Sequence, residues 1–207
     1  MIAAALHDAS RAWRGASFRL RGMEAPDEEL MLAYQRGDAG AFDTLYGRHK
    51  GPLYRFMLRA VKNGGVTDEL YQDVWMRVIE SRARYEPTAK FKTWLYTIAH
   101  NRMMDHFRRH SLRVVESSED AAEIAESVAD AAGAQPENLV ESRADLRRLA
   151  DAIAALPPVQ REAFLLHQES GMTVPEIAEA TGTPVEAAKS RLRYALQKLR
   201  EALSDGG

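Results

Sequence analysis

Basic and aromatic side chains alternate between Arg82 and Arg109, and this mixture of residue types suits binding to unpaired nucleic acid. Cations can follow a phosphate backbone while aromatic rings stack on exposed bases. The basic members are Arg82, Arg84, Lys90, Lys92, Arg102, Arg108 and Arg109, and the aromatic members are Tyr85, Phe91, Trp94, Tyr96 and Phe107. The alternative is a hydrophobic core with a solvated face around it. We expect both to be partly true, because Trp94 and Ile98 share one face of a helix.

A second candidate site lies near the C-terminus, where the sequence has the pattern of a helix–turn–helix. A short helix from Val174 to Ala180 would meet a turn that contains Gly182, and a longer helix would run from Val185 to Leu203. In such motifs the second helix enters the major groove of DNA, which is wide enough to admit it. The residues that open this helix are Val185, Glu186, Ala187, Ala188, Lys189, Ser190, Arg191 and Arg193. A helical hairpin with a solvated basic face is the alternative interpretation.

A third candidate is the segment from Asp68 to Glu80, where Gln72 and Asp73 lie off the apolar face. They could meet a basic partner, although exposed acids on a helix are ordinarily solvated. Taken by itself, this segment favours the solvated interpretation.

The sequence contains no recognisable catalytic motif. The six histidines have no metal-ligand spacing, and Gly64-Gly65 lacks the Lys-Ser/Thr that would follow in a phosphate-binding loop. No nucleophile elbow is present. Cysteine is absent, which excludes disulfides and cysteine-ligated zinc. We therefore expect no catalytic residue, no metal and no cofactor.

Helices must position these residues, because no segment of useful length has the period of a strand. The apolar spacing predicts helices that begin near residues 27, 38, 67, 91, 141, 161, 174 and 185. We expect Gly37 to end the first helix, and Asp38 and Thr67 to cap the second and third. Gly51-Pro52 should kink or locally break the second helix. The fold class is therefore all-α.

Charge is distributed unevenly along the chain, whose net charge is −2. Residues 26–110 have a balance of +3, residues 111–142 a balance of −7, and residues 143–207 a balance of zero. The acidic segment has few large apolar side chains and cannot offset its ordering entropy by burial. We expect two small helical domains, 26–110 and 143–207, joined by a flexible acidic linker over 111–142 and preceded by a disordered arm over 1–25.

Two further expectations concern the start of the chain and its compartment. Residues 1–22 show no helical period or cap, so we expect translation to start at Met23. No run approaches the roughly 18 apolar residues that a membrane-spanning helix needs. We expect a cytoplasmic chain with no membrane insertion of its own.

Taken together, these segments resemble the extracytoplasmic-function sigma factors of RNA polymerase, over roughly 27–110 and 146–203. The ordered set at these separations carries the resemblance more than any single motif. The motifs of the first half are Gly37-Asp38, Ala41-Phe42, Leu45-Tyr46, Leu53-Tyr54, Glu69-Leu70-Tyr71-Gln72-Asp73-Val74-Trp75, Phe91-Lys92-Thr93-Trp94-Leu95, Ala99-His100-Asn101-Arg102 and Asp105-His106-Phe107-Arg108-Arg109. The motifs of the second half are Leu156-Pro157, Arg161-Glu162-Ala163-Phe164, Glu176-Ile177-Ala178 and Lys189-Ser190-Arg191-Leu192.

The resemblance implies a function in transcription initiation without enzymatic activity. The implied partners are core RNA polymerase (the clamp helices of its β′ subunit and the flap of its β subunit), promoter DNA and an anti-sigma factor. The implied polymerase-binding residues are Leu70, Gln72, Asp73 and Trp75. The implied residues for binding and melting the minus-ten element are Tyr85, Lys90, Lys92, Trp94, Tyr96, His100, Asn101, Arg102, Arg108 and Arg109. The implied residues for the minus-thirty-five element are Thr173, Val185, Glu186, Lys189, Ser190, Arg191, Arg193 and Tyr194.

Two positions depart from the family pattern. Tyr194 stands where the family often has Arg, and Ala188 replaces a common Val.

The competing functions are a helix–turn–helix regulator that never joins polymerase and a module that binds only proteins. Co-elution with core polymerase would separate the sigma factor from both.

Overall fold

A computed structural model describes residues 25–116 and 139–204, and every regular element in these two ranges is helical. The first range contains α2 (Asp27–Gln35), α3 (Ala39–Val61), α4 (Gly64–Ser81), the short 3-10 helix η2 (Arg82–Arg84) and α5 (Phe91–Glu116). The second contains α6 (Leu139–Ala155), α7 (Pro158–Ser170), α8 (Val174–Ala180) and α9 (Val185–Ser204). The predicted all-α fold is confirmed for the described residues.

The helix ends follow the predicted signals at some positions and depart from them at others. Gly37 has a φ of 102° after α2, and the Asp38 side chain accepts hydrogen bonds from the first amides of α3, as predicted. The cap of α4 was predicted wrongly. Asn63 is the N-cap, accepting from the Val66 amide at 3.0 Å, and Thr67 is buried inside the helix.

Of the two outcomes predicted for Gly51-Pro52, a kink or a local break, the break does not occur, and the kink stays a prediction. α3 runs without interruption from Ala39 to Val61, with Pro52 inside it. A proline removes one helical hydrogen bond and costs about 3 kcal/mol in a helix interior. The fully buried Leu53, Phe56 and Met57 follow directly and tie this part of α3 into the hydrophobic core. We attribute the continuous helix to this packing.

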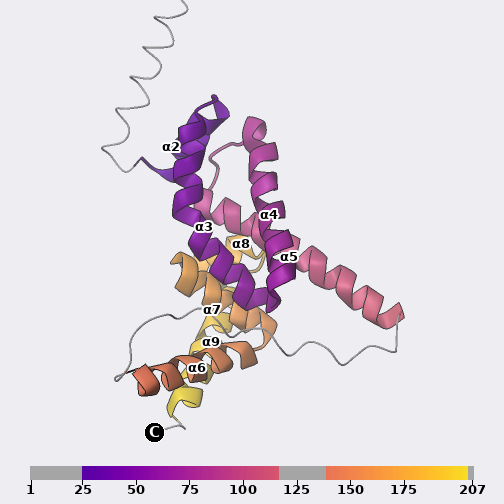
Figure 1. Ribbon diagram of the computed structural model, residues 1–207, viewed down its shortest axis with the longest axis vertical. Coiled ribbons are helices and arrows are strands. Elements are labelled where there is room, and N and C mark those ends of the chain that lie inside the picture. The colour runs from indigo at the N-terminus through magenta and orange to yellow at the C-terminus, as the bar shows by residue number, and fades with distance from the viewer. Residues whose placement is uncertain (1–24, 117–138, 205–207) are drawn as a thin grey trace, which may run out of the picture.

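The helices form two groups that pack against each other (Figure 1). The first group is α2 to α5 and the second is α6 to α9, in which α8 and α9 form a hairpin against α7. The buried side chains of both groups form one hydrophobic cluster. Between the groups, α3 packs on α7 and α5 packs on α8. The C-terminal half of α5 projects away from both groups (Figure 1).

Both ends of the segment predicted as a linker, 111–142, are helical. α5 continues to Glu116 and α6 starts at Leu139, so the helical pattern extends beyond the expected limits of 110 and 143. Residues 117–138 lie outside the described residues, and so do residues 1–24, with the predicted arm and the proposed start at Met23.

Candidate nucleic-acid and polymerase interfaces

The helix–turn–helix forms as the sequence predicted. The Glu176 carboxylate accepts from the backbone amide of Thr173 at 2.8 Å and from its hydroxyl at 3.0 Å, which fixes the start of α8. Gly182 has a φ of 61° in the turn, a conformation that glycine adopts without steric cost. The buried Ala188, Leu192, Ala195 and Leu199 hold α9 against its neighbours. The opposite side of α9 is therefore free to face a partner.

The predicted minus-thirty-five residues lie mainly on this free side of α9. Thr173, Val185, Glu186, Lys189, Arg193 and Tyr194 are exposed, and Ser190 is half-buried. Arg191 is also half-buried, and at roughly 100° per residue it lies about 200° around the helix from Lys189. The two cations therefore do not share a face, whereas Lys189 and Arg193 are one helical turn apart and do. The Arg193 guanidinium lies 4.9 Å from the Tyr194 ring centroid.

Three of the predicted minus-ten residues contact the second group of helices. Lys90 Nζ lies 2.7 Å from Glu176 Oε1, and Lys92 Nζ donates to the carbonyl oxygen of Ser170 at 3.0 Å. His100 Nδ1 lies 2.6 Å from Glu162 Oε1. Each of these groups could instead face a DNA phosphate. In this arrangement carboxylates and carbonyls of the second half occupy that position.

Glu176 is the most strongly perturbed carboxylate in this contact. Burial would raise its pKa, but hydrogen bonds from Lys90 and Thr173 and the charge of Lys92 outweigh burial and hold the pKa at about 2. The same hydrogen bond raises the pKa of Lys90. Both groups are therefore charged near neutral pH, and the contact joins the two halves by an ion pair.

A second set of polar contacts joins α3 to the other half of the chain. The Glu169 carboxylate is 8% exposed and accepts from Arg55 Nε at 2.8 Å and from Arg59 Nη1. Lys62 Nζ and Arg161 Nη1 both donate to the carbonyl oxygen of Ala154, at 2.6 Å and 3.0 Å. Ala154 lies in the last turn of α6, where the helix dipole favours cations. Burial and, for Lys62, the neighbouring Arg161 charge lower the pKa of both cations.

The aromatic residues predicted to stack on bases are less accessible than expected. Tyr85 is 4% exposed and packs against Phe91 and Trp94, with ring centroids 6.3 Å and 5.1 Å away. Burial and the nearby charges of Glu28 and Asp27 raise the pKa of Tyr85 to about 12. We correct the prediction for Tyr85, because its ring is part of the hydrophobic core of the first half.

Tyr96 and Trp94 differ from Tyr85 in what surrounds them. Tyr96 is fully buried, and burial and the charge of Glu169 raise its pKa, so the second half of the chain lies close to its hydroxyl. It cannot stack on a base in this arrangement. Trp94 is half-buried, as predicted, and packs against the hydrophobic core.

The remaining minus-ten candidates lie further along α5. Asn101 is exposed, and so are Arg108 and Arg109 on the projecting part of the helix (Figure 1). Arg102 forms an ion pair with Asp73 of α4. This pair brings together a residue predicted for DNA and one predicted for polymerase, which the sequence did not indicate.

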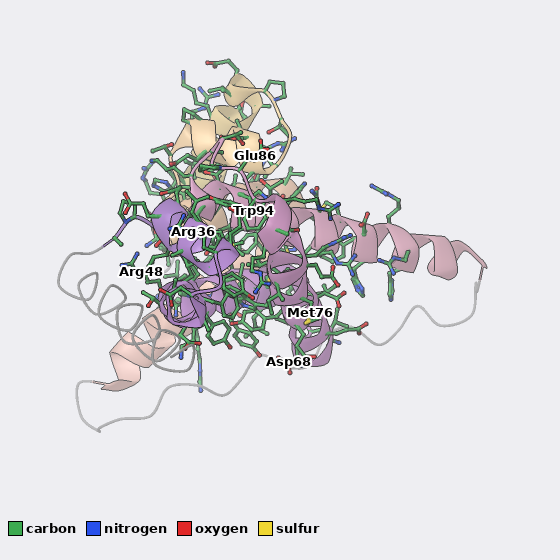
Figure 2. The ribbon with its side chains drawn as sticks, turned by 90° about the horizontal axis from the view of Figure 1, so that it is seen from above. Arg36, Arg48, Asp68, Met76, Glu86 and Trp94 are labelled. Carbon is green, nitrogen blue, oxygen red and sulfur yellow. The ribbon has the colours of Figure 1, made fainter. Side chains whose placement is uncertain are left out.

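The predicted polymerase-binding segment divides into buried and exposed residues. Leu70 and Trp75 are 5% and 6% exposed, so we correct their predicted direct contact to a packing role. Gln72 is exposed and Asp73 half-buried. The sequence analysis missed Met76, which is 53% exposed and lies one helical turn after Gln72. In Figure 2 Met76 and Asp68 lie on the same side of the molecule. The i, i+4 spacing from Gln72 could have identified Met76.

Within the described ranges, no group of three or more His, Asp or Glu side chains could hold a metal ion. No helix in the same ranges is long and apolar enough to cross a membrane.

The combination of a helix–turn–helix in one half and a basic, partly aromatic helix in the other defines a DNA-binding transcription factor. The sigma-70 region 2 family matches residues 45–113, and the sigma-70 region 4 family matches residues 146–199. The chain belongs to the extracytoplasmic-function group of RNA polymerase sigma factors, which are transcription initiation factors and not enzymes. The predicted family, function and lack of enzymatic activity are confirmed.

Several sigma factors are similar to this chain over most of their length. CarQ of Myxococcus xanthus is 37% identical over 84% of this chain and 96% of its own. NccH of Alcaligenes xylosoxydans xylosoxydans is 32% identical over 86% and 94%. SigK of Mycobacterium sp. strain KMS, an extracytoplasmic-function sigma factor, is 31% identical over 84% and 89%.

Two solved structures share the fold at 23% identity. The sigma factor RpoE of Bartonella quintana, solved with the anti-sigma factor NepR, has a TM-score of 0.67 and covers 80% of this chain and 98% of its own. CnrH, solved with the cytosolic domain of CnrY, has a TM-score of 0.63 and covers 87% and 99%.

Proposed function

We propose that this sigma factor binds core RNA polymerase through the exposed face of α4, captures the unpaired minus-ten strand along α5 and reads the minus-thirty-five duplex with α9. The observation that carries the proposal is the free polar side of α9, where Glu186, Lys189 and Arg193 are exposed behind a correctly formed turn. A recognition helix needs such a face to enter the major groove.

The minus-ten assignment is supported by the chemistry of α5 and its flanks. Lys90, Lys92 and His100 already bind carboxylate and carbonyl oxygens of the second half, so they are placed to bind phosphate oxygens once those partners leave. Binding of the minus-ten strand therefore requires the two halves of the chain to separate. We propose that they act as two domains, 26–110 and 143–207, and that segment 111–142 is the tether between them.

The polymerase contacts follow from the same division. Gln72, Asp73 and Met76 offer polar and apolar groups on one side of α4, suited to the clamp helices of the β′ subunit. The second domain would contact the β flap. Action in the cytoplasm follows from binding to core polymerase.

An anti-sigma factor is the expected inhibitory partner. The sigma factor RpoE, which shares the fold, was solved with the anti-sigma factor NepR, and CnrH, which also shares the fold, was solved with the cytosolic domain of CnrY. We propose that an anti-sigma factor binds the arrangement in which the two halves are packed together, because in that arrangement Lys90, Lys92 and His100 are already bound by the second half of the chain.

Run-off transcription with core polymerase tests the proposal. The holoenzyme should select promoters from a library of randomised duplexes, and the sigma factor alone should be inert. With a selected promoter, Asn101→Ala should slow open-complex formation and leave binding to a minus-thirty-five duplex unchanged. The Asn101 amide can offer hydrogen bonds to an unpaired base, each worth about 0.5–1.5 kcal/mol, so permanganate footprints should detect the loss. A chain that neither binds core polymerase nor selects a promoter would overturn the proposal.

A further inference from the structure

Helix α2 contacts the first part of the segment 82–90, which joins α4 to α5. The Gln35 side-chain amide donates to the carbonyl oxygens of Ala83 and Tyr85, both at 3.2 Å. The Arg82 guanidinium lies 5.0 Å from the centroid of the Tyr34 ring. One residue of α2 therefore donates to two carbonyl groups of this connection, one inside η2 and one directly after it.

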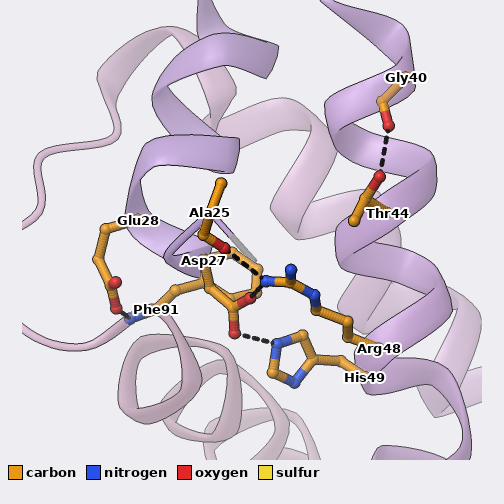
Figure 3. Close-up of polar contacts among 8 residues, drawn as sticks. All are labelled: Ala25, Asp27, Glu28, Gly40, Thr44, Arg48, His49 and Phe91. Carbon is orange, nitrogen blue, oxygen red and sulfur yellow. Dashed lines mark hydrogen bonds and ion pairs between the residues drawn. The ribbon is translucent and has the colours of Figure 1, made fainter. Parts of the chain in front are cut away.

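The other end of α2 contacts the end of the same segment. Glu28 Oε1 accepts a hydrogen bond from the backbone amide of Phe91 at 2.6 Å (Figure 3). Phe91 is the first residue of α5, and the first amides of a helix have no partner within it. Glu28 therefore caps α5 from a distant part of the chain, and its negative charge suits the positive end of the helix dipole.

Ion pairs hold the start of α2 against α3, so the position of α2 is fixed independently of segment 82–90. Asp27 accepts from Arg48 Nη1 at 2.6 Å and lies 2.6 Å from His49 Nε2 (Figure 3). Burial would raise the pKa of Asp27, but the hydrogen bonds with His49 and Arg48 outweigh it and lower the pKa. The His49 ring packs 5.3 Å from the Phe91 ring. Gln35 and Glu28 therefore contact the connection from a helix whose own position is fixed by its contacts with α3.

The segment depends on this support because it has little regular structure of its own. Residues 85–90 are not helical, and Arg84, Glu86 and Thr88 are exposed (Figure 2 labels Glu86). A flexible segment must be ordered when it binds, and the ordering entropy lowers affinity. Holding both ends of the segment in advance removes part of that cost.

We propose that Gln35 and Glu28 are positioning residues for capture of the unpaired minus-ten strand. Acting through the backbone of Ala83, Tyr85 and Phe91, they set the path of segment 82–90 and the start of α5 without touching DNA. The inference rests on the proposed function, in which the unpaired strand is captured along α5.

The test compares holoenzyme variants on a promoter selected by the wild-type holoenzyme, using a fork-junction DNA whose minus-ten strand is already unpaired. Gln35→Glu keeps the size of the side chain but removes both donors, and Gln35→Ala removes them without adding a charge. Glu28→Ala removes the acceptor for the Phe91 amide, and Glu28→Gln retains it. Gln168→Glu and Glu29→Ala are matched controls at exposed positions.

The dissociation constant for the fork junction should rise about tenfold for both Gln35 variants and about fivefold for Glu28→Ala, as expected for lost hydrogen bonds. Glu28→Gln and the controls should stay within about twofold of wild type. Affinity for core polymerase and for a minus-thirty-five duplex should not change in any variant, which a merely structural role of Gln35 would not predict.

Two results would overturn the inference and leave the proposed function standing. Unchanged fork-junction binding in the Gln35 and Glu28→Ala variants would show that α2 does not position the segment. A parallel loss of polymerase and minus-thirty-five binding would show that these residues only stabilise the fold. A wild-type holoenzyme that selects no promoter would overturn the proposed function itself, and this inference with it.

Discussion

Glu169 should control how firmly the two halves of the free sigma factor stay together. Its carboxylate is 8% exposed and binds both Arg55 and Arg59 of α3. A hydrogen bond to a charged group contributes about 1.5–3 kcal/mol when buried, but exposed ion pairs contribute about 0–1 kcal/mol. The side chains of the two arginines are 52% and 46% exposed, so water can replace much of the hydrogen bonding that they lose when the Glu169 carboxylate is removed. For Glu169→Gln we expect about 1–2 kcal/mol, which raises the ratio of separated to packed molecules about 5- to 30-fold.

Single-molecule energy transfer can measure this ratio. The natural chain has no cysteine, so Thr88→Cys and Glu179→Cys provide the only two thiols for dyes on either side of the contact between α5 and α8. Glu80→Gln, at an exposed position of α4, is the matched control. Arg55→Ala should have a much smaller effect in the Glu169→Gln background than in wild type.

The reasoning would be refuted by either of two results. The first is a Glu169→Gln protein whose distance distribution equals that of the control. The second is strict additivity between Arg55→Ala and Glu169→Gln, which would mean that the two side chains do not interact in solution.

The other predictions concern single contacts. Gln72→Ala should weaken binding to core polymerase in a pull-down titration and change the free energy of unfolding by less than about 0.5 kcal/mol, because the side chain is exposed; full retention of affinity would remove Gln72 from the interface. Lys189→Ala should lower the salt dependence of minus-thirty-five binding by about one unit, whereas Arg191→Ala should cost about 1–3 kcal/mol at one base pair only if it reaches a guanine; an effect of Arg191→Ala that equals that of Lys189→Ala on every sequence would contradict their placement on different faces. The pKa of Glu176 is held below its usual 4.5, at about 2, so its carboxylate stabilises the folded chain above pH 4.5 and this contribution disappears as pH falls through about 2. Wild type and Glu176→Gln should therefore differ in unfolding midpoint near neutral pH and converge in acid, and a constant difference across the titration would contradict the assignment.

Local signals were sufficient for much of the fold. Gly37 and Asp38 mark helix ends in the structure as they do in the sequence, because a cap depends on residues within one turn. The same reasoning failed at Thr67, where Asn63 was an equally good cap four residues earlier. At Pro52 the local break, one of the two predicted outcomes, does not occur, because packing of the following residues overrides the cost of the proline.

The candidate sites were harder to predict, because their geometry depends on distant parts of the chain. The spacing of Lys92 and His100 indicates a basic face, but their partners lie 78 and 62 residues away, and no periodicity reports such a pairing. Burial was misjudged for the same reason at Tyr85, whose type suits both base stacking and a hydrophobic core. Glu28 and Gln35 gave no signal as parts of a site, since each acts on backbone groups that every residue has.

In the proposal, the side chains of Lys90, Lys92 and His100 bind the second half of the chain in the free protein and promoter phosphates in the open complex. This limits which substitutions these three positions can accept. If they bind the promoter as proposed, any substitution among them alters two equilibria together: stronger phosphate binding and a looser resting chain cannot be obtained separately at these positions. Arg55, Arg59 and Glu169 join the two halves to each other and have no part in the proposed promoter contacts. Variation at those three positions could therefore adjust how readily the sigma factor becomes available, and leave its choice of promoters as it was.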